Sequence, residues 1–72
     1  MILDCKVGDI TYKVDPNLKL YRRSDWEETE WHKYDHLTPW IPEVGVALYI
    51  DHGDGSYRMT GLVEGIQEGV VS

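Results

Sequence analysis

The chain has few of the features that stabilise or export small secreted domains. It contains one cysteine, Cys5, among 72 residues, so no intramolecular disulfide can form. The apolar start at Met1-Ile2-Leu3 is interrupted by Asp4, and no apolar run approaches the roughly 20 residues that span a bilayer. We therefore expect neither a signal peptide nor a transmembrane helix, no contact with a membrane, and a cytoplasmic location.

Positive charge is also scarce. The chain has 7 Lys and Arg residues against 13 Asp and Glu residues, which gives a net charge of −6. Residues 1–23 carry a net charge of +2, whereas residues 24–72 carry −8. Phosphate contacts require a concentrated basic surface, so direct nucleic-acid binding is disfavoured. An acidic surface could instead compete with nucleic acid for a basic partner, or could simply keep the protein soluble.

Catalytic and metal-binding motifs are missing. Side chains with metal-ligand atoms form two groups, which are His32, Asp35 and His36, and then Asp51, His52 and Asp54. On a helix, His32 and His36 would have the four-residue spacing of two zinc ligands, but neither group completes a zinc or calcium motif. Cys5 has no obvious base beside it. A chain this short can hardly enclose a substrate cleft. We therefore predict no enzyme activity, no cofactor and no metal, with a metal-binding module kept as an alternative.

A β-hairpin pattern surrounds the dipeptide Gly8-Asp9. If these are the two loop residues, three apolar pairs share one face, namely Leu3 with Val14, Cys5 with Tyr12, and Val7 with Ile10. Asp4 then opposes Lys13 on the other face. A slip of one residue would mix the two faces, so the pattern fixes this register. Gly8 should adopt a positive φ as the first residue of a type II′ turn.

The middle of the chain is harder to interpret. Residues 15–17 predict a turn, and the alternation over residues 18–23 predicts a third strand that pairs with the preceding one. Ser24 and Glu27 match a capping box, so residues 25–34 form either a short helix or an irregular excursion. Residues 35–42 contain Pro39 and Pro42 and should be a non-helical loop.

A second hairpin is predicted around Gly53-Asp54, with strands over residues 44–50 and 57–64. With a two-residue loop, the buried face contains Ile50 opposite Tyr57, Leu48 opposite Met59, Val46 opposite Gly61, and Val44 opposite Val63. The reverse face then pairs Tyr49 with Arg58 and Ala47 with Thr60. Gly61 suggests a bulge, and residues 66–72 either add a short edge strand through Val70 and Val71 or fray.

These elements predict a single small domain over residues 1–72 that is mainly β, either all-β or α+β. Two antiparallel hairpins and a third meander strand would form a small curled sheet or a five-stranded barrel. The short helix or irregular excursion would lie between the two hairpins.

The aromatic residues indicate a function. All three tryptophans lie in the middle segment beside an acidic block, and we predict a protein-binding surface formed by Trp26, Glu27, Glu28, Glu30, Trp31, Tyr34 and Trp40. Trp26 should share a helical face with Tyr34 and cover the sheet, which leaves Trp31 as the expected anchor. Our hypothesis is a non-enzymatic inhibitor or adaptor that occupies a partner protein's surface. The alternative is a nucleic-acid mimic that inhibits a DNA- or RNA-binding protein, a role that would fit a virus or mobile element.

Overall fold

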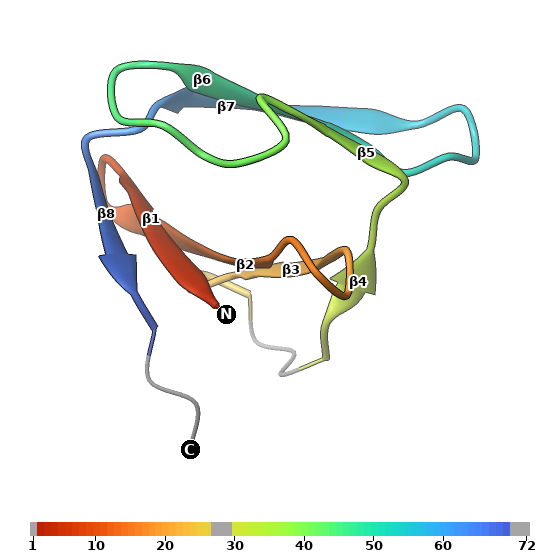
Figure 1. Cartoon of the computed structure of the whole chain (residues 1–72), viewed down its shortest axis with the longest axis horizontal. Coiled ribbons are helices and arrows are strands. Elements are labelled where there is room, and N and C mark those ends of the chain that lie inside the picture. Colours follow the sequence, from red (N-terminus) through yellow and green to blue (C-terminus); the bar gives the residue numbers. More distant parts are fainter. Residues whose placement is uncertain (1, 27–29, 70–72) are drawn as a thin grey trace.

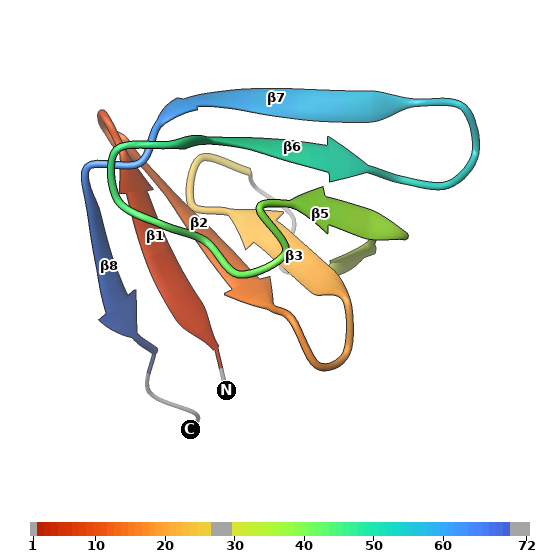
Figure 2. The same cartoon turned by 45° about the horizontal axis from the view of Figure 1, so that its top comes forward.

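Two antiparallel sheets pack face to face in the computed structural model, which describes residues 2–26 and 30–69 (Figure 1). The five-stranded sheet has the order β4-β3-β2-β1-β8, and the three-stranded sheet has the order β5-β6-β7. The strands are β1 (Leu3–Val7), β2 (Ile10–Asp15), β3 (Leu20–Arg23), β4 (His32–Lys33), β5 (His36–Thr38), β6 (Ala47–Asp51), β7 (Tyr57–Leu62) and β8 (Gly65–Glu68). The strands of one sheet cross those of the other at a steep angle (Figure 2).

The predicted fold class is confirmed, because the protein is mainly β and its sheets are antiparallel. The two sheets do not close into a barrel, so the barrel alternative is wrong. No helix occurs in the described residues, and a helix that could cross a membrane is likewise missing from them. The β4 strand at residues 32–33 pairs with β3, which excludes a helix running through residue 34.

The first hairpin has the predicted register, with Leu3 opposite Val14 and Cys5 opposite Tyr12. Gly8 has a φ of +60°, while Asp9 is outside the positive-φ region, as a type II′ turn requires. The third strand also pairs with β2 as predicted, although it begins at Leu20. Local turn chemistry and one apolar face are therefore sufficient to define this half of the fold.

The second hairpin does not have the predicted register. Ile50 lies opposite Arg58, and Tyr49 lies opposite Met59, so β7 is shifted by one residue along β6. Residues 44 and 46 precede β6, and both valines are exposed. As a result, Tyr57 and Met59 are on the exposed face of the sheet, whereas we predicted them in the core.

The connection between β6 and β7 explains this shift. Five residues separate the strands, and the His52 amide donates a hydrogen bond to the Ser56 carbonyl, with an N···O distance of 3.1 Å. Gly53 and Gly55 both have positive φ, and the Asp51 carboxylate accepts a 2.9 Å hydrogen bond from the Gly53 amide. The loop is thus longer than the two residues we assumed, which moves every following residue to the opposite face.

The predicted bulge occurs in β7. Tyr49 pairs with Met59 and Ala47 pairs with Leu62, so β7 has one more residue than β6 between these two pairs. The Thr60 hydroxyl accepts a 3.0 Å hydrogen bond from the Leu48 amide, which satisfies a donor that the bulge removes from the backbone ladder. A Cβ at Gly61 would lie 3.3 Å from a Val7 methyl carbon, so glycine allows β7 to approach β1 closely.

The core lies between the two sheets. It includes Cys5, Tyr12, Val14 and Tyr21 from the five-stranded sheet, together with Tyr34, Leu37, Leu48, Ile50 and Val63. Leu48 and Ile50 are fully buried, as predicted. The β8 strand pairs with β1 at the edge of the five-stranded sheet, and the strand predicted through Val70 and Val71 lies outside the described residues.

Candidate functional site

The residues that we predicted for partner binding differ in exposure where the structure describes them. Glu27 and Glu28 lie outside the described residues, and Glu30 is exposed. Trp31 is half-buried, and the Arg22 guanidinium carbon lies 5.9 Å from the centroid of its ring. Trp31 is therefore partly covered, which leaves it less free to act as an anchor than we expected.

Two of the predicted residues belong mainly to the interior. Trp26 is half-buried and packs against the core, with its ring centroid 5.7 Å from that of Tyr21. Tyr34 is buried, and burial together with the negative charge of Asp15 raises the pKa of its phenol. Both rings cover the sheet, as predicted for them, even though they do so from connecting segments and without a helix.

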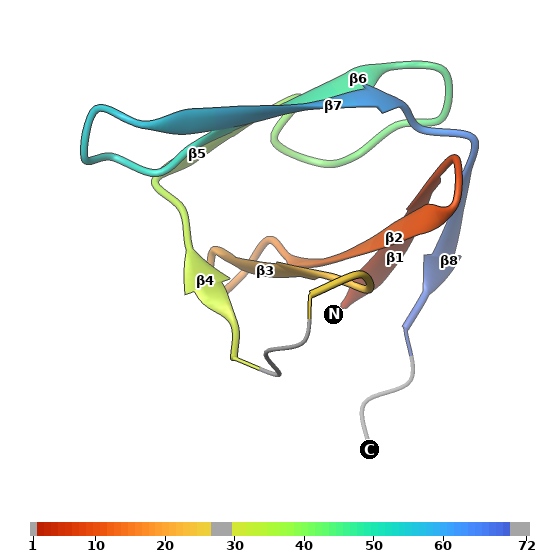
Figure 3. The same cartoon turned by 180° about the vertical axis from the view of Figure 1, so that it is seen from behind.

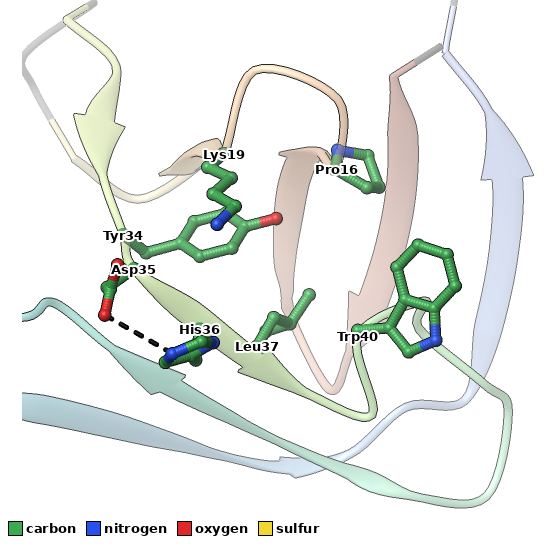
Figure 4. Close-up of a pocket in the computed structure, with 7 residues that line it drawn as sticks. All are labelled: Pro16, Lys19, Tyr34, Asp35, His36, Leu37 and Trp40. Atoms are coloured by element: carbon green, nitrogen blue, oxygen red, sulfur yellow. Dashed lines mark ion pairs between the residues drawn. The ribbon is translucent and has the colours of Figure 1, made fainter.

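Trp40 is the most accessible of these aromatic residues, with 72% of its surface exposed. It borders a pocket of about 190 Å³ whose other lining residues include Lys19, Tyr34 and Leu37 (Figure 4). Asp35 and His36 lie at one side of this pocket, with an N···O distance of 3.5 Å. They form an ion pair when the imidazole is protonated. The pocket is small and its described lining contains no serine or cysteine, so it offers a recess beside an exposed ring.

An exposed apolar surface on β7 was not predicted from the sequence. The side chains of Tyr57, Met59 and Leu62 on β7 are 61%, 62% and 63% exposed. In the β6–β7 register they share a face with Tyr49 and Ala47, and the rings of Tyr49 and Tyr57 stack with centroids 5.1 Å apart. We call this surface the outer face, because it points away from the core between the sheets, and no described element covers it (Figure 1).

Sequence signals for the outer face did exist. Asp51 and Asp54 each accept a hydrogen bond from the amide two residues later, which is the Asx-turn pattern, and both glycines of the loop follow an aspartate within two residues. This pattern favours a loop longer than two residues. The longer loop observed here places the side chains of Tyr57 and Met59 on the exposed face of the sheet.

A chain of hydrogen bonds joins the two sheets. The Tyr21 hydroxyl lies 2.6 Å from His52 Nε2, and His52 Nδ1 lies 3.0 Å from Ser56 Oγ. Ser56 Oγ donates its only hydrogen to Asp54 Oδ1, at 2.5 Å, so it must accept from His52 Nδ1–H. His52 Nε2 is then the acceptor for the Tyr21 hydroxyl. Hydrogen bonds from the Ser56 side chain and backbone lower the pKa of Asp54.

This arrangement is not a catalytic triad. In a triad the carboxylate orients the histidine and the histidine activates the serine, whereas here the Asp54 carboxylate contacts Ser56 and His52 Nε2 is occupied by Tyr21. The single thiol is unsuitable as a nucleophile, because burial and the nearby charge of Asp4 raise the pKa of Cys5 to about 11. No group of three or more metal-ligating side chains occurs in residues 2–26 and 30–69.

The geometry therefore offers an exposed apolar face and a polar cleft between the sheets, and comparison with known proteins adds no further guide. No protein-family model, curated protein or solved structure matches the chain.

Proposed function

We propose that this protein binds a partner protein through the outer face of its three-stranded sheet, and acts without catalysis by occupying the partner's surface. The observation that carries this proposal is the exposure of Tyr57, Met59 and Leu62, each of which leaves more than 60% of its surface accessible. Contiguous exposed apolar side chains of this size mark interaction sites on soluble proteins, because leaving them in water is unfavourable.

The exposed apolar residues are concentrated in one part of the chain. Among the described residues, every large apolar side chain that is exposed lies within residues 40–62, with Leu18 as the exception. The set includes Trp40, a residue type that often supplies binding energy at the centre of interfaces. This distribution favours an interface made by the three-stranded sheet and the loop that joins β5 to β6.

Charge specifies the kind of partner. Residues 35–64 contain five carboxylates and one arginine, for a net charge of −4. That arginine, Arg58, is paired with the buried Ile50, and its guanidinium carbon lies 5.4 Å from the centroid of the Trp26 ring, on the inner side of the sheet. The segment that carries the outer face is therefore net acidic. This charge favours a partner protein whose own apolar patch is accompanied by lysine and arginine.

The proposed role is still that of an inhibitor or adaptor, as predicted from the sequence. The proposed binding surface is now the outer face and no longer the segment of residues 26–40. The predicted centre at residues 26–40 contains two rings that pack into the interior, Trp26 and Tyr34. Of that set, Trp40 remains available as an anchor. A nucleic-acid mimic would depend on rows of carboxylates, and it differs from an apolar interface in how strongly salt weakens it.

Two matched charge insertions test the outer face. Met59→Lys places a charge in the middle of it, whereas Leu18→Lys makes the same kind of change at a 67% exposed leucine in the β2–β3 turn. Wild-type protein and both variants would be immobilised and used to capture partners from a lysate of the source cells, and a captured protein would then be purified for calorimetry. We expect Met59→Lys to weaken binding more than tenfold and Leu18→Lys to have little effect.

Folding of both variants is checked first by circular dichroism. We expect both to keep the wild-type structure, because the substituted positions are exposed. Equal binding by Met59→Lys and wild type would overturn the proposal. A steep loss of affinity for the wild-type protein between low and high salt, with no effect of Met59→Lys, would favour the nucleic-acid mimic. A modest loss with salt agrees with an apolar interface that is accompanied by charged residues.

We also propose that the protein acts in the cytoplasm. The support for this is its single cysteine, Cys5, which is a buried free thiol in the core, as is common where thiols stay reduced. A redox-sensitive disulfide between two copies would require Cys5 to leave the core. Fluorescent-fusion imaging in the source cells, with fractionation as a control, tests the location.

A further inference from the structure

A second site lies between the two sheets, and its lining residues come from β3, β4, β7 and the connecting loops. Figure 3 shows how the two sheets that carry these elements face each other. It is a cleft of about 300 Å³, separate from the outer face because it opens on the inner side of the three-stranded sheet. Its walls come from residues far apart in the sequence, from Tyr21 to Arg58. This volume is at the lower end of the range for small-molecule pockets.

One wall of the cleft is aromatic. The rings of Trp26 and His32 meet edge to face with centroids 4.5 Å apart, and Tyr21 lies 5.7 Å from Trp26 and 6.1 Å from His32. His52 stacks against Tyr21, with centroids 5.7 Å apart and an angle of 18° between the rings. A planar ring that enters the cleft would therefore meet other rings in stacking or edge-on geometries, which are favourable for aromatic pairs.

Positive charge lies beside this aromatic wall, because the Arg58 guanidinium carbon is 5.4 Å from the centroid of the Trp26 ring. Lys33 on β4 and Arg58 on β7 both line the cleft, and neither forms an ion pair within the described part of the chain. The Arg58 Nε atom is buried and has no hydrogen-bond acceptor among those residues. A ligand oxygen in the cleft would therefore bond to the terminal nitrogens of the guanidinium, whose fork suits two oxygens of a phosphate.

The cleft is held in shape before any ligand binds. The hydrogen bonds from Tyr21 through His52 and Ser56 to Asp54 join β3 to the β6–β7 loop. They fix the ring of His52 and the hydroxyl of Tyr21, so little conformational entropy would be lost there on binding. Asp54 is the only carboxylate that lines the cleft in the described residues, and its Oδ1 atom already accepts two hydrogen bonds from Ser56.

We propose that this cleft binds a small molecule in which a planar aromatic ring is joined to a phosphate group. The phosphate would lie between Lys33 and Arg58, whose planar guanidinium suits two phosphate oxygens, and the ring would pack against Trp26 and His32. Two classes of small molecule share this chemistry: simple aryl phosphates and nucleoside monophosphates. The site is independent of the partner surface, because Met59 points to the opposite side of the same sheet.

The test compares four probes by calorimetry and by chemical shifts of the backbone amides and the Trp26 indole. Phenyl phosphate and adenosine monophosphate contain both the ring and the phosphate, whereas inorganic phosphate and adenosine each contain one part. We expect both complete probes to bind at least tenfold more tightly than either part, with shifts at the cleft residues. Tighter binding of the nucleotide would identify nucleotides as the source, and tighter binding of phenyl phosphate would identify aryl phosphates.

Variants separate a specific site from general attraction to cations. Arg58→Gln and Lys33→Gln should each weaken phenyl phosphate binding more than tenfold, whereas Lys6→Gln removes the same charge from an exposed position on β1 and should change it less than twofold. Lys33 is exposed, so Lys33→Gln decides the outcome if Arg58→Gln fails to fold. Met59→Lys should bind phenyl phosphate like wild type, which keeps this test separate from that of the partner surface.

Three results would overturn the proposal. The first is the absence of cleft shifts at millimolar phenyl phosphate. The second is equal affinity for phenyl phosphate and inorganic phosphate, which would indicate attraction of an ion without ring recognition. The third is unchanged binding in both Arg58→Gln and Lys33→Gln.

Discussion

The register of the second hairpin can be tested with two alanine substitutions on neighbouring strands. Leu48 on β6 is 0% exposed at the centre of the core, while Met59 on β7 is 62% exposed and lies opposite Tyr49. A two-residue loop would instead place Leu48 opposite Met59, with both side chains buried. Leu48→Ala and Met59→Ala would therefore lower the free energy of unfolding by similar amounts in the two-residue register. In the observed register only Leu48→Ala should lower it substantially.

The magnitudes follow from burial. Replacing a fully buried leucine with alanine costs about 2–5 kcal/mol, because apolar contacts are lost and a cavity remains. A domain of 72 residues has a total free energy of unfolding of roughly 4–11 kcal/mol, so Leu48→Ala should remove a large share of it. At an exposed position such as Met59 the change should stay within about 0.5 kcal/mol.

Urea unfolding followed by circular dichroism measures both effects in one series. For Leu48→Ala we expect a loss of about 3 kcal/mol, which corresponds to a decrease of roughly 12–24 °C in Tm for a domain of this size. Met59→Ala should unfold at nearly the wild-type urea concentration, with an unchanged slope. Comparable losses of about 2–4 kcal/mol for both variants would refute the observed register and place Met59 in the core.

Two further predictions concern the first hairpin. Gly8 has a φ of +60°, which strains residues with a Cβ, so Gly8→Val should lower Tm by several degrees more than Asp9→Val; the reverse order would show that the loop is placed wrongly. The folded-state pKa of Cys5 is raised to about 11, so its contribution to stability is complete below its ordinary pKa near 9 and declines between pH 9 and 11. Cys5→Ala should show a shallower loss of stability over that interval in urea unfolding, and an identical loss would contradict the burial of the thiol.

The first half of the fold could be predicted because its loop is short and its faces are distinct. Gly8-Asp9 supports a two-residue turn, and the apolar pairs on one side leave Asp4 and Lys13 together on the other, where they form a 3.1 Å ion pair. A slip of one residue would bury these charges. Local chemistry and burial therefore favour the same structure.

The second half was predicted less well because the more apolar face of β7 points away from the core. Tyr57 and Met59 are exposed, whereas Arg58 lies opposite the buried Ile50, so alternation favoured the wrong face of this strand. The loop determines the register, because Asp51 and Gly53 favour a connection longer than two residues. Likewise, the capping-box pattern at Ser24 was consistent with a helix, but β4 pairs with β3 instead.

The same one-residue shift produces both proposed sites. Moving β7 along β6 turns Tyr57 and Met59 outward, and the alternation of side chains then turns Arg58 inward, where its guanidinium lies over Trp26. In the two-residue register Arg58 would face solvent, so the cleft would lose its guanidinium and the outer face would lose its apolar side chains. The Leu48 and Met59 comparison therefore tests a condition that both sites share. The binding experiments then separate them, because Met59→Lys and Arg58→Gln alter opposite sides of one strand.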